Sequence, residues 1–399
     1  MPELKRGLPL YSPLGFRMRP EAESLEAREQ VRLPNPGLVF DRFVDLWDID
    51  GDGRCRVQEP VGGKGSKRCW LEEVRDLYEQ ARNGIDANLG KSVERHRDMV
   101  ERLGGACPEA RIDWRFVSGI GNGHPYEAGF TWHRTLGVPY LPGSSVKGML
   151  RAWADPEHGW GAAAKEEVRH LFGSTDEVGE LIVFDALPMR SPPLKLDIMN
   201  PHYSAYYAHQ AGHGEEAVPP ADYLSPKPIF FLTVTDEVPF LFGLAPRRQG
   251  LEAEQDLERG LELLKDALAT LGAGAKTAVG YGTMKLDHDA LEQRRRELIE
   301  RKLQEERQKY LDGLTPELRR VELLRERLDH LALLALSDRK ESLRRDVAEL
   351  LNHATRWKRE DDRLAAAQLG EAVYEKLGWG SNERTALRNR QRIAALRNN

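Results

Sequence analysis

The order of hydrophobic patterns between residues 111 and 289 is the feature that most restricts the fold of this chain. Residues 111–116 alternate in polarity, which predicts a strand with Ile112, Trp114 and Phe116 on one half-buried face. The later elements are a helix at 145–154, buried strands at 181–185, 229–234 and 239–244, a leucine-rich helix at 257–271 and a closing strand at 281–286. Strand-helix-strand followed by strand-helix-strand is the ferredoxin-like plan, so we expect an α+β, RRM-like domain.

A long insertion is predicted within this domain. Residues 186–228 contain eight prolines and show no clear apolar period. Loops of this length inside a compact domain are usually functional. We therefore expect residues 111–289 to form one domain that is interrupted by a functional insertion.

Two further regions flank the predicted domain. Residues 1–110 read as a proline-rich arm and a helical segment that packs on the core, with a helix at 70–103 that is broken near Gly84. Residues 290–399 lack strand-like alternation and predict a helical C-terminal module. Within that module, the Thr-Pro-Glu sequence that begins at Thr315 predicts the start of a new helix.

The charge of the chain is distributed unevenly along the sequence. The whole chain of 399 residues has a net charge of −5, and 31% of its residues are charged. Residues 290–399 carry 25 basic and 20 acidic residues, whereas the rest carries 34 and 44. A nucleic-acid surface in the first part must therefore be a local basic patch on an acidic background.

The start of the predicted helix at 145–154 concentrates hydrogen-bond donors and positive charge. Ser144 or Ser145 is predicted to be its N-cap, and Lys147 and Arg151 lie one turn apart on its polar side. The apolar side consists of Val146, Met149, Leu150 and Trp153. Free amides, the positive end of the helix dipole and two cations favour a phosphate or another anion. The alternative is an ordinary capped amphipathic helix with solvated basic residues.

A glycine-rich segment, LGAGAKTAVGYG at 271–282, is the second candidate site. Its glycines are Gly272, Gly274, Gly280 and Gly282. A P-loop is excluded because Ala275 replaces the required glycine and because the segment runs from helix to strand. We expect the glycines to let a ligand approach the backbone, with Lys276 supplying charge and Tyr281 a stacking surface. A plain turn between a helix and a strand is the alternative.

These motifs carry a resemblance to a known family. The pattern G-x-PY-x-PG-S-S-x-KG-x-x-R and the glycine-rich segment resemble the first-helix motif and the glycine-rich loop of the RAMP superfamily, the RNA-binding proteins of CRISPR systems. The stretches NPGLVFDRFV, KLDIMNPHYSAYY and PADYLSPKPIFFLTV are similar to one branch, the sixth subunits of Cmr (type III-B) effector complexes. The resemblance covers residues 35–287, with the motifs in the order of the family.

The resemblance implies a non-catalytic, RNA-binding structural subunit that caps the complex near the 3′ end of the guide RNA. It implies contacts with guide and target RNA, with the repeated backbone RAMP subunit and with the small helical subunit, and it requires no cofactor. The implied RNA-binding residues are His124, Ser144, Ser145, Lys147, Arg151, Gly272, Gly274, Lys276, Gly280, Tyr281 and Gly282. The insertion would be a thumb with His202, Tyr203 and Tyr206 as stacking residues. An endoribonuclease that uses His124 is the alternative.

A calcium-loop pattern follows a helix predicted at 38–47. Its fixed positions are Asp48, Asp50, Asp52, Gly53 and Glu59. Oxygen ligands at this spacing suit a hard cation, but Arg56 occupies a position where an acceptor is common and Pro60 obstructs the usual exit helix. Calcium binding and a plain acidic turn therefore both remain open, and the family resemblance does not require a metal here.

The expected location is the cytoplasm, away from membranes. No apolar run approaches the eighteen residues that a membrane span needs, and the first ten residues lack the apolar core of a signal peptide. The three cysteines are scattered, which suits free thiols in a reducing compartment.

Overall fold

The structure is a computed structural model of the 399-residue chain. It describes residues 33–42, 44, 47–49, 55–57, 66–125, 127–158, 161–203, 206, 219, 226, 228–236, 238–332, 337–380 and 382–398. The chain divides into two compact units, Met1–Glu292 (unit 1) and Gln293–Asn399 (unit 2). The boundary lies inside helix α7 (His288–Asp312).

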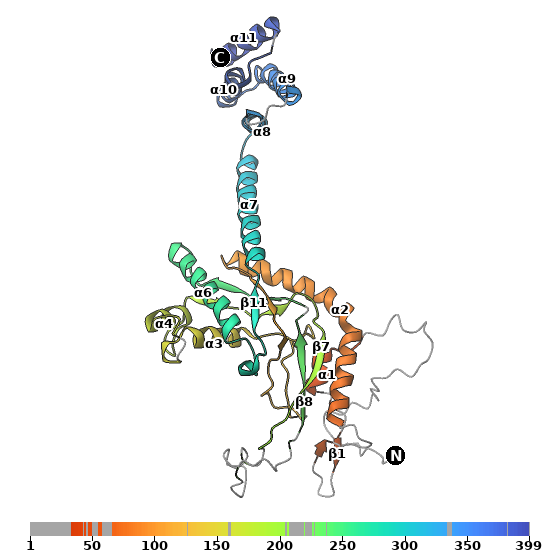
Figure 1. The fold of residues 1–399 in the computed structure, drawn as a ribbon. Coiled ribbons are helices and arrows are strands. Elements are labelled where there is room, and N and C mark those ends of the chain that lie inside the picture. Colours follow the sequence, from red (N-terminus) through yellow and green to blue (C-terminus); the bar gives the residue numbers. More distant parts are fainter. Residues whose placement is uncertain are drawn as a thin grey trace, which may run out of the picture. The chain divides into compact units, whose positions relative to one another are not determined.

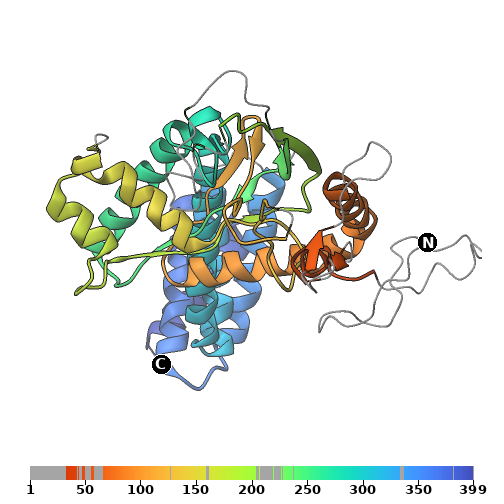
Figure 2. The ribbon, with the colours of Figure 1, turned by 90° about the horizontal axis from the view of Figure 1, so that it is seen from below.

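A four-stranded antiparallel sheet lies at the centre of unit 1 (Figure 1). Its strands are β3 (Glu109–Ile112), β6 (Leu187–Pro188), β9 (Phe240–Leu241) and β11 (Met284–Leu286). Their order across the sheet is β11-β3-β9-β6, so the strands that come first and last in the chain are neighbours. Helix α3 (Gly143–Ala154) connects the first two strands, and α6 (Leu251–Thr270) connects the last two. The two helices pack side by side (Figure 2).

Two smaller sheets extend this core. Strands β4 (Arg115–Phe116), β8 (Ile229–Thr235) and β7 (Leu194–Met199) form a three-stranded sheet in the order β4-β8-β7. Strand β5 (Leu181–Val183) pairs with β10 (Leu244–Pro246). The strand predicted at 181–185 therefore exists but lies outside the four-stranded sheet, where β6 takes the expected position.

The predicted insertion begins with ordered strands. β6 belongs to the four-stranded sheet, and β7 pairs along its whole length with β8, from Leu194↔Val234 to Met199↔Ile229. The absence of an apolar period therefore does not mean an absence of strands here, because the β7–β8 ribbon satisfies its own backbone hydrogen bonds. Most residues between 204 and 227 lie outside the described part of the chain.

The strand predicted at 111–116 is divided by a bend. Ile112 and Phe116 are buried as expected, but the side chain of Trp114 is 50% exposed. The chain leaves β3 at Ile112, and the Asp113 amide still donates to the Thr283 carbonyl before the chain enters β4 in the other sheet. The placement of Trp114 on a buried face was therefore wrong, because the change of sheet interrupts the alternation.

The long helix α2 (Ser66–Arg102) packs along unit 1. It runs without interruption past Gly84, so the predicted break does not occur. Its buried side chains are Trp70, Leu71, Val74, Leu77, Tyr78, Ile85, Leu89, Val93 and Val100. This apolar face contacts β7, β8 and β10, and tertiary packing of this kind outweighs the low helix propensity of one glycine.

The segment before α2 differs from the prediction. Helix α1 (Pro36–Arg42) ends five residues before Trp47, where the predicted helix would have ended. Strand β1 (Trp47–Ile49) instead pairs with β2 (Cys55–Val57), and Asp48 lies opposite Arg56. The other three carboxylates of the calcium pattern lie outside the described residues, and for Asp48 only the backbone is described. Calcium binding therefore stays a prediction.

Helix α6 follows its leucine pattern. Leu257, Leu261, Leu264 and Leu268 are all buried. The helix ends at Thr270, and the Gly272 amide, at φ +74°, donates to the Ala267 carbonyl. A glycine in the left-handed conformation thus ends this helix. The shorter helix α4 (Lys165–Phe172) packs against α3.

Unit 2 is a helical module, as the sequence predicted. Its further helices are α8 (Pro316–Ala332), α9 (Ser337–Ala354), α10 (Glu360–Leu377) and α11 (Glu383–Asn398). The Thr315 hydroxyl accepts from the Leu318 amide at 3.2 Å, which confirms the predicted helix start. A core of leucine, valine and alanine side chains around Leu350 and Val373 is fully buried between these helices. Among the described helices of the chain, none has an apolar stretch long enough to cross a membrane.

Candidate nucleic-acid interface

The start of α3 is capped from elsewhere in the chain. The helix begins at Gly143, whose amide donates to Asp185 Oδ1 at 2.6 Å. The predicted serine N-cap was wrong, because Ser144 and Ser145 lie inside the first turn and are exposed. A carboxylate at this position is favoured by the helix dipole. A side chain at position 143 would place a Cβ 2.7 Å from the Val183 carbonyl oxygen, so glycine is required for this close approach.

The two faces of α3 are separated as predicted. Val146 and Leu150 are buried, and Met149 and Trp153 pack partly buried against the same core. The polar side chains of α3 lie on the opposite face, toward solvent. The amphipathic interpretation of this helix is therefore confirmed.

Lys147 and Arg151 are joined by a third cation, Arg247, which follows β10. Arg151 Nη1 donates to the Gly173 carbonyl at 3.3 Å, and Arg247 Nε donates to the Gly179 carbonyl at 2.9 Å. Burial, together with the charges of Arg247 and Arg151, lowers the pKa of Lys147 below its usual value. We call Lys147, Arg151 and Arg247 the cation trio.

Backbone carbonyls orient the two arginines of the cation trio without neutralising them. The nearby carboxylates pair with other cations: Glu177 with Arg169 at 2.8 Å and Glu180 with Arg248 at 3.3 Å. Repulsion among three like charges is relieved when an anion binds between them. Guanidinium groups with further donors suit the oxygens of a phosphate.

Three of the four loop glycines serve the packing of the loop itself. Gly272, Gly274 and Gly282 all have positive φ. A Cβ on Gly274 would lie 2.3 Å from the Val117 carbonyl oxygen, and one on Gly282 would lie 1.8 Å from that of Ala273. We expected these glycines to let a ligand approach the backbone. At these three positions the group that approaches closely is instead the protein's own backbone. Only at Gly280, among these four, does a Cβ meet no atom within 4 Å.

Tyr281 is part of the interior. Its side chain is 5% exposed, and its hydroxyl donates to Asp197 Oδ2 at 2.7 Å. Arg115 forms an ion pair with the same carboxylate. Burial, followed by the hydrogen bond to Asp197, raises the pKa of Tyr281 to about 12. The prediction that Tyr281 offers a stacking surface was wrong, because only 5% of its surface is exposed.

Lys276 is held over an aromatic ring. Its backbone adopts the left-handed conformation at φ +59°. Its Nζ lies 5.7 Å from the ring centroid of Phe231 and 3.9 Å from Met199 Sδ. This arrangement keeps a positive charge between the loop and the β7–β8 ribbon.

His124 is engaged in packing. Its ring stacks on Phe40 with centroids 4.2 Å apart, and its Nε2 donates to the Phe40 carbonyl at 2.9 Å. Burial lowers the pKa of His124, although the charge of Asp41 opposes this effect. Proton transfer from this ring to RNA, as in the endoribonuclease alternative, stays a prediction.

The three predicted thumb residues lie at the end of the described ribbon. His202 is exposed, and Tyr203 and Tyr206 are half-buried. The rings of His202 and Tyr203 are 6.3 Å apart. They follow the last residue of β7 in the chain, and a stacking role for them stays a prediction.

The predicted residues are thus distributed over separate parts of unit 1. Lys147 and Arg151 belong to the cation trio, Lys276 and Tyr281 to the loop beside Asp197, and His124 packs on α1. Arg247 and Asp185 were not among the predicted residues, because both are far from α3 in the chain and no local pattern points to either. Among the described residues, no group of three or more His, Cys, Asp or Glu side chains is arranged to hold a metal.

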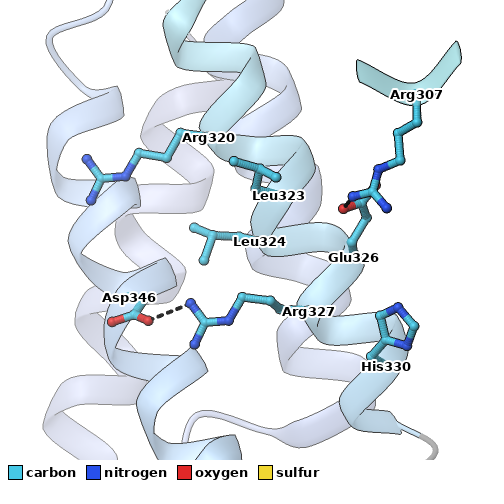
Figure 3. Close-up of a pocket in the computed structure, with 8 residues that line it drawn as sticks. All are labelled: Arg307, Arg320, Leu323, Leu324, Glu326, Arg327, His330 and Asp346. Atoms are coloured by element: carbon cyan, nitrogen blue, oxygen red, sulfur yellow. Dashed lines mark hydrogen bonds and ion pairs between the residues drawn. The ribbon is translucent and has the colours of Figure 1, made fainter. Parts of the chain in front are cut away.

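Unit 2 contains a pocket of about 560 Å³ on α7, α8 and α9 (Figure 3). Its arginines are engaged in ion pairs: Arg327 with Asp346 at 2.8 Å, and Arg307 with Glu326. Leu323 and Leu324 form its apolar part. Carboxylates therefore already balance the cations of this pocket, whereas the described residues include no ion pair with a member of the cation trio.

Comparison with known proteins agrees with this architecture. Residues 103–285 match the model of the RAMP superfamily. This segment contains the four-stranded sheet, α3, α6 and the glycine-rich loop, so the class of the protein is that of a RAMP.

The particular family follows from individual relatives. The CRISPR system Cmr subunit Cmr6 of Pyrococcus furiosus is 32% identical over 251 residues, which cover 49% of this chain and 72% of the relative. The corresponding subunit of Saccharolobus solfataricus is 24% identical over 163 residues and is covered over 49% of its length. The chain belongs to the Cmr6 family. A structure of type III-B Cmr-beta bound to cognate target RNA aligns with a TM-score of 0.40 at 20% identity, covering 57% of this chain and 77% of that one.

Proposed function

We propose that this protein is an RNA-binding structural subunit of a type III-B Cmr complex, and that the cation trio holds phosphates of the guide RNA. The observation that carries the proposal is the convergence of Lys147, Arg151 and Arg247, two of them oriented by backbone carbonyls. Membership of the Cmr6 family supports the assignment to the complex. Ser144 and Ser145, exposed in the first turn of α3, supply hydroxyl donors beside the trio.

The arrangement of unit 1 supports a ferredoxin-like RAMP domain with a thumb. Its four-stranded sheet has the antiparallel order of fourth, first, third and second strand, with a helix in each crossover. The β7–β8 ribbon belongs to the neighbouring sheet, and residues 200–228 connect its two strands along the chain. In our proposal, this ribbon carries the insertion toward the duplex of guide and target RNA.

The proposed role is non-catalytic and requires no cofactor. His124, the residue that an endoribonuclease would use, packs on Phe40 and donates to its carbonyl. The subunit would cap the complex near the 3′ end of the guide, beside the last backbone RAMP subunit and the small helical subunit. The helical unit 2 offers a further surface for such protein partners.

The proposal is tested by purifying the tagged, full-length protein gently from its host. Mass spectrometry identifies the proteins that accompany it, and sequencing identifies the RNA. We expect Cmr subunits together with short RNAs that share a repeat-derived 5′ tag. Recovery of the protein alone, with the ability to cut repeat RNA at a fixed position, would contradict the proposal and favour the endoribonuclease.

A further inference from the structure

An exposed tryptophan stands beside the glycine-rich loop. The side chain of Trp114 is 50% exposed, at the bend between β3 and β4. Exposing half of an indole leaves a large apolar surface in water, which is unfavourable unless a partner covers it. The charge and rigidity of its surroundings indicate which kind of partner that is.

The ring of Trp114 rests on a rigid support. Its centroid lies 5.0 Å from that of Tyr281, and the Arg115 guanidinium carbon lies 5.3 Å from the indole centroid. Asp197 joins these two supports, because it accepts from the Tyr281 hydroxyl and pairs with Arg115. A ring that is fixed before binding loses little conformational entropy when a ligand stacks on it.

The backbone on either side of Trp114 is fixed as well. The Asp113 amide donates to the Thr283 carbonyl at 2.9 Å, and Arg115 pairs with Thr235 in the β4–β8 ladder. The Gly282 amide donates to the Arg115 carbonyl at 2.7 Å, which ties the bend to the glycine-rich loop. The exposed indole is therefore held between two sheets and one loop.

Three cations belong to this region, and two of them, Arg115 and Lys285, are paired with carboxylates. Lys285 reaches Asp113 at 3.0 Å, and its side chain remains 80% exposed. Lys276 lies over Phe231, whose ring is 6.1 Å from that of Tyr281. An aromatic surface with cations near it suits single-stranded nucleic acid, since the base stacks while the backbone phosphate meets the charge.

We propose that Trp114 is a stacking platform for an unpaired RNA base. This inference rests on the proposed RNA-binding function and extends it, because the cation trio recognises phosphate whereas Trp114 recognises the base. The Tyr281–Asp197–Arg115 group is the positioning device beneath the platform. Stacking is largely indifferent to base identity, so the platform selects unpaired over paired bases.

The test compares two oligomers of equal length and charge: oligouridine and its abasic counterpart. Binding of each to the full-length protein is measured by fluorescence anisotropy at fixed salt. The wild type should prefer oligouridine, and Trp114→Ala should weaken oligouridine binding about 5- to 100-fold while leaving abasic binding unchanged. Trp114→Phe should retain most of the preference. Tyr310→Ala is the matched control, because Tyr310 is an exposed aromatic residue (57%) in unit 2.

Each outcome decides a different point. If the wild type and Trp114→Ala bind oligouridine equally and with the same preference over the abasic oligomer, the stacking platform is wrong although the RNA-binding function stands. If the wild type binds neither oligomer, the proposed function itself fails. If Trp114→Ala weakens the binding of both oligomers equally and lowers the melting temperature of the protein, Trp114 has a structural role and the inference is overturned.

Cross-linking gives an independent measurement. RNA that carries 5-iodouridine at single unpaired positions is irradiated with the protein, and the linked peptide is identified by mass spectrometry. We expect a link at Trp114 that disappears when the RNA is annealed to its complement. A link confined to other residues, or recovery of a protein partner on this surface in place of RNA, would contradict the platform.

Discussion

The two units differ in net charge and in whether their cations are paired with carboxylates. Unit 1 contains 34 basic and 45 acidic residues, whereas unit 2 contains 25 and 19. Yet the cation trio, oriented by carbonyls, lies in the acidic unit. In the basic unit, arginines pair with carboxylates within the unit, as Arg327 does with Asp346 and Arg397 with Glu371.

The difference shows that net charge is a poor guide to an anion site. A guanidinium paired with a carboxylate contributes little field at a distance, because the two charges nearly cancel. A small cluster of like charges keeps its field, even on a negative background.

Cavities in the two cores should act on their own unit alone. Leu264→Ala in unit 1 and Leu350→Ala in unit 2 each remove a fully buried side chain, and each should cost about 2–5 kcal/mol of the unfolding free energy of its unit. Differential scanning calorimetry of the full chain should show one shifted transition for each variant. A single transition that shifts equally in both variants would show that the units unfold together.

Removal of the cation trio should weaken RNA binding more than removal of paired arginines. Lys147→Ala, Arg151→Ala and Arg247→Ala together should reduce affinity by at least about tenfold and lower the salt slope by about 2. The matched control is the triple alanine variant of Arg307, Arg320 and Arg327 in unit 2. Filter binding at several salt concentrations measures both quantities, and equal losses in the two variants would remove the basis of the contrast.

Acidification should destabilise unit 1 through three half-buried histidines. Burial lowers the pKa of His96, His124 and His133, although Asp185 opposes the shift at the first and third. The folded unit thus binds fewer protons than the unfolded chain, so its stability is greatest above pH 6.5 and falls at lower pH. The unit 1 melting temperature should drop between pH 7.5 and 6.

A glutamine substitution isolates the contribution of His124. The amide of Gln in His124→Gln can still donate to the Phe40 carbonyl but does not titrate. The pH dependence of the melting temperature should therefore become shallower, and any RNA cleavage should be unaffected. An unchanged pH profile would assign the effect to the other two histidines, and loss of a cleavage activity would support the endoribonuclease.

The ion pairs of unit 2 should contribute least. Arg327 and Asp346 are 48% and 31% exposed, so their interaction is screened by water and salt. A double-mutant cycle with Arg327→Ala and Asp346→Ala should give a coupling of about 0.2–1 kcal/mol that declines at high salt. A coupling well above this range would mean that the ion pairs of this pocket contribute substantially to the stability of unit 2.

Local sequence patterns predicted the helices well and the site only in part. The leucine spacing around Leu264 and the polar face with Lys147 follow from helix geometry, which depends on nearby residues alone. Arg247 and Asp185 reach α3 through tertiary contacts across about 40–100 positions, so no window of sequence shows them. Trp114 was misplaced because the alternation rule assumes that one strand stays in one sheet.

The Asp185 carboxylate at the start of α3 has a consequence for the order of assembly. Because the chain supplies its own acceptor to the Gly143 amide, the helix is complete before any RNA arrives. In the proposed function, the start of α3 therefore needs no guide RNA as a scaffold, because its first amide already has an acceptor within the chain.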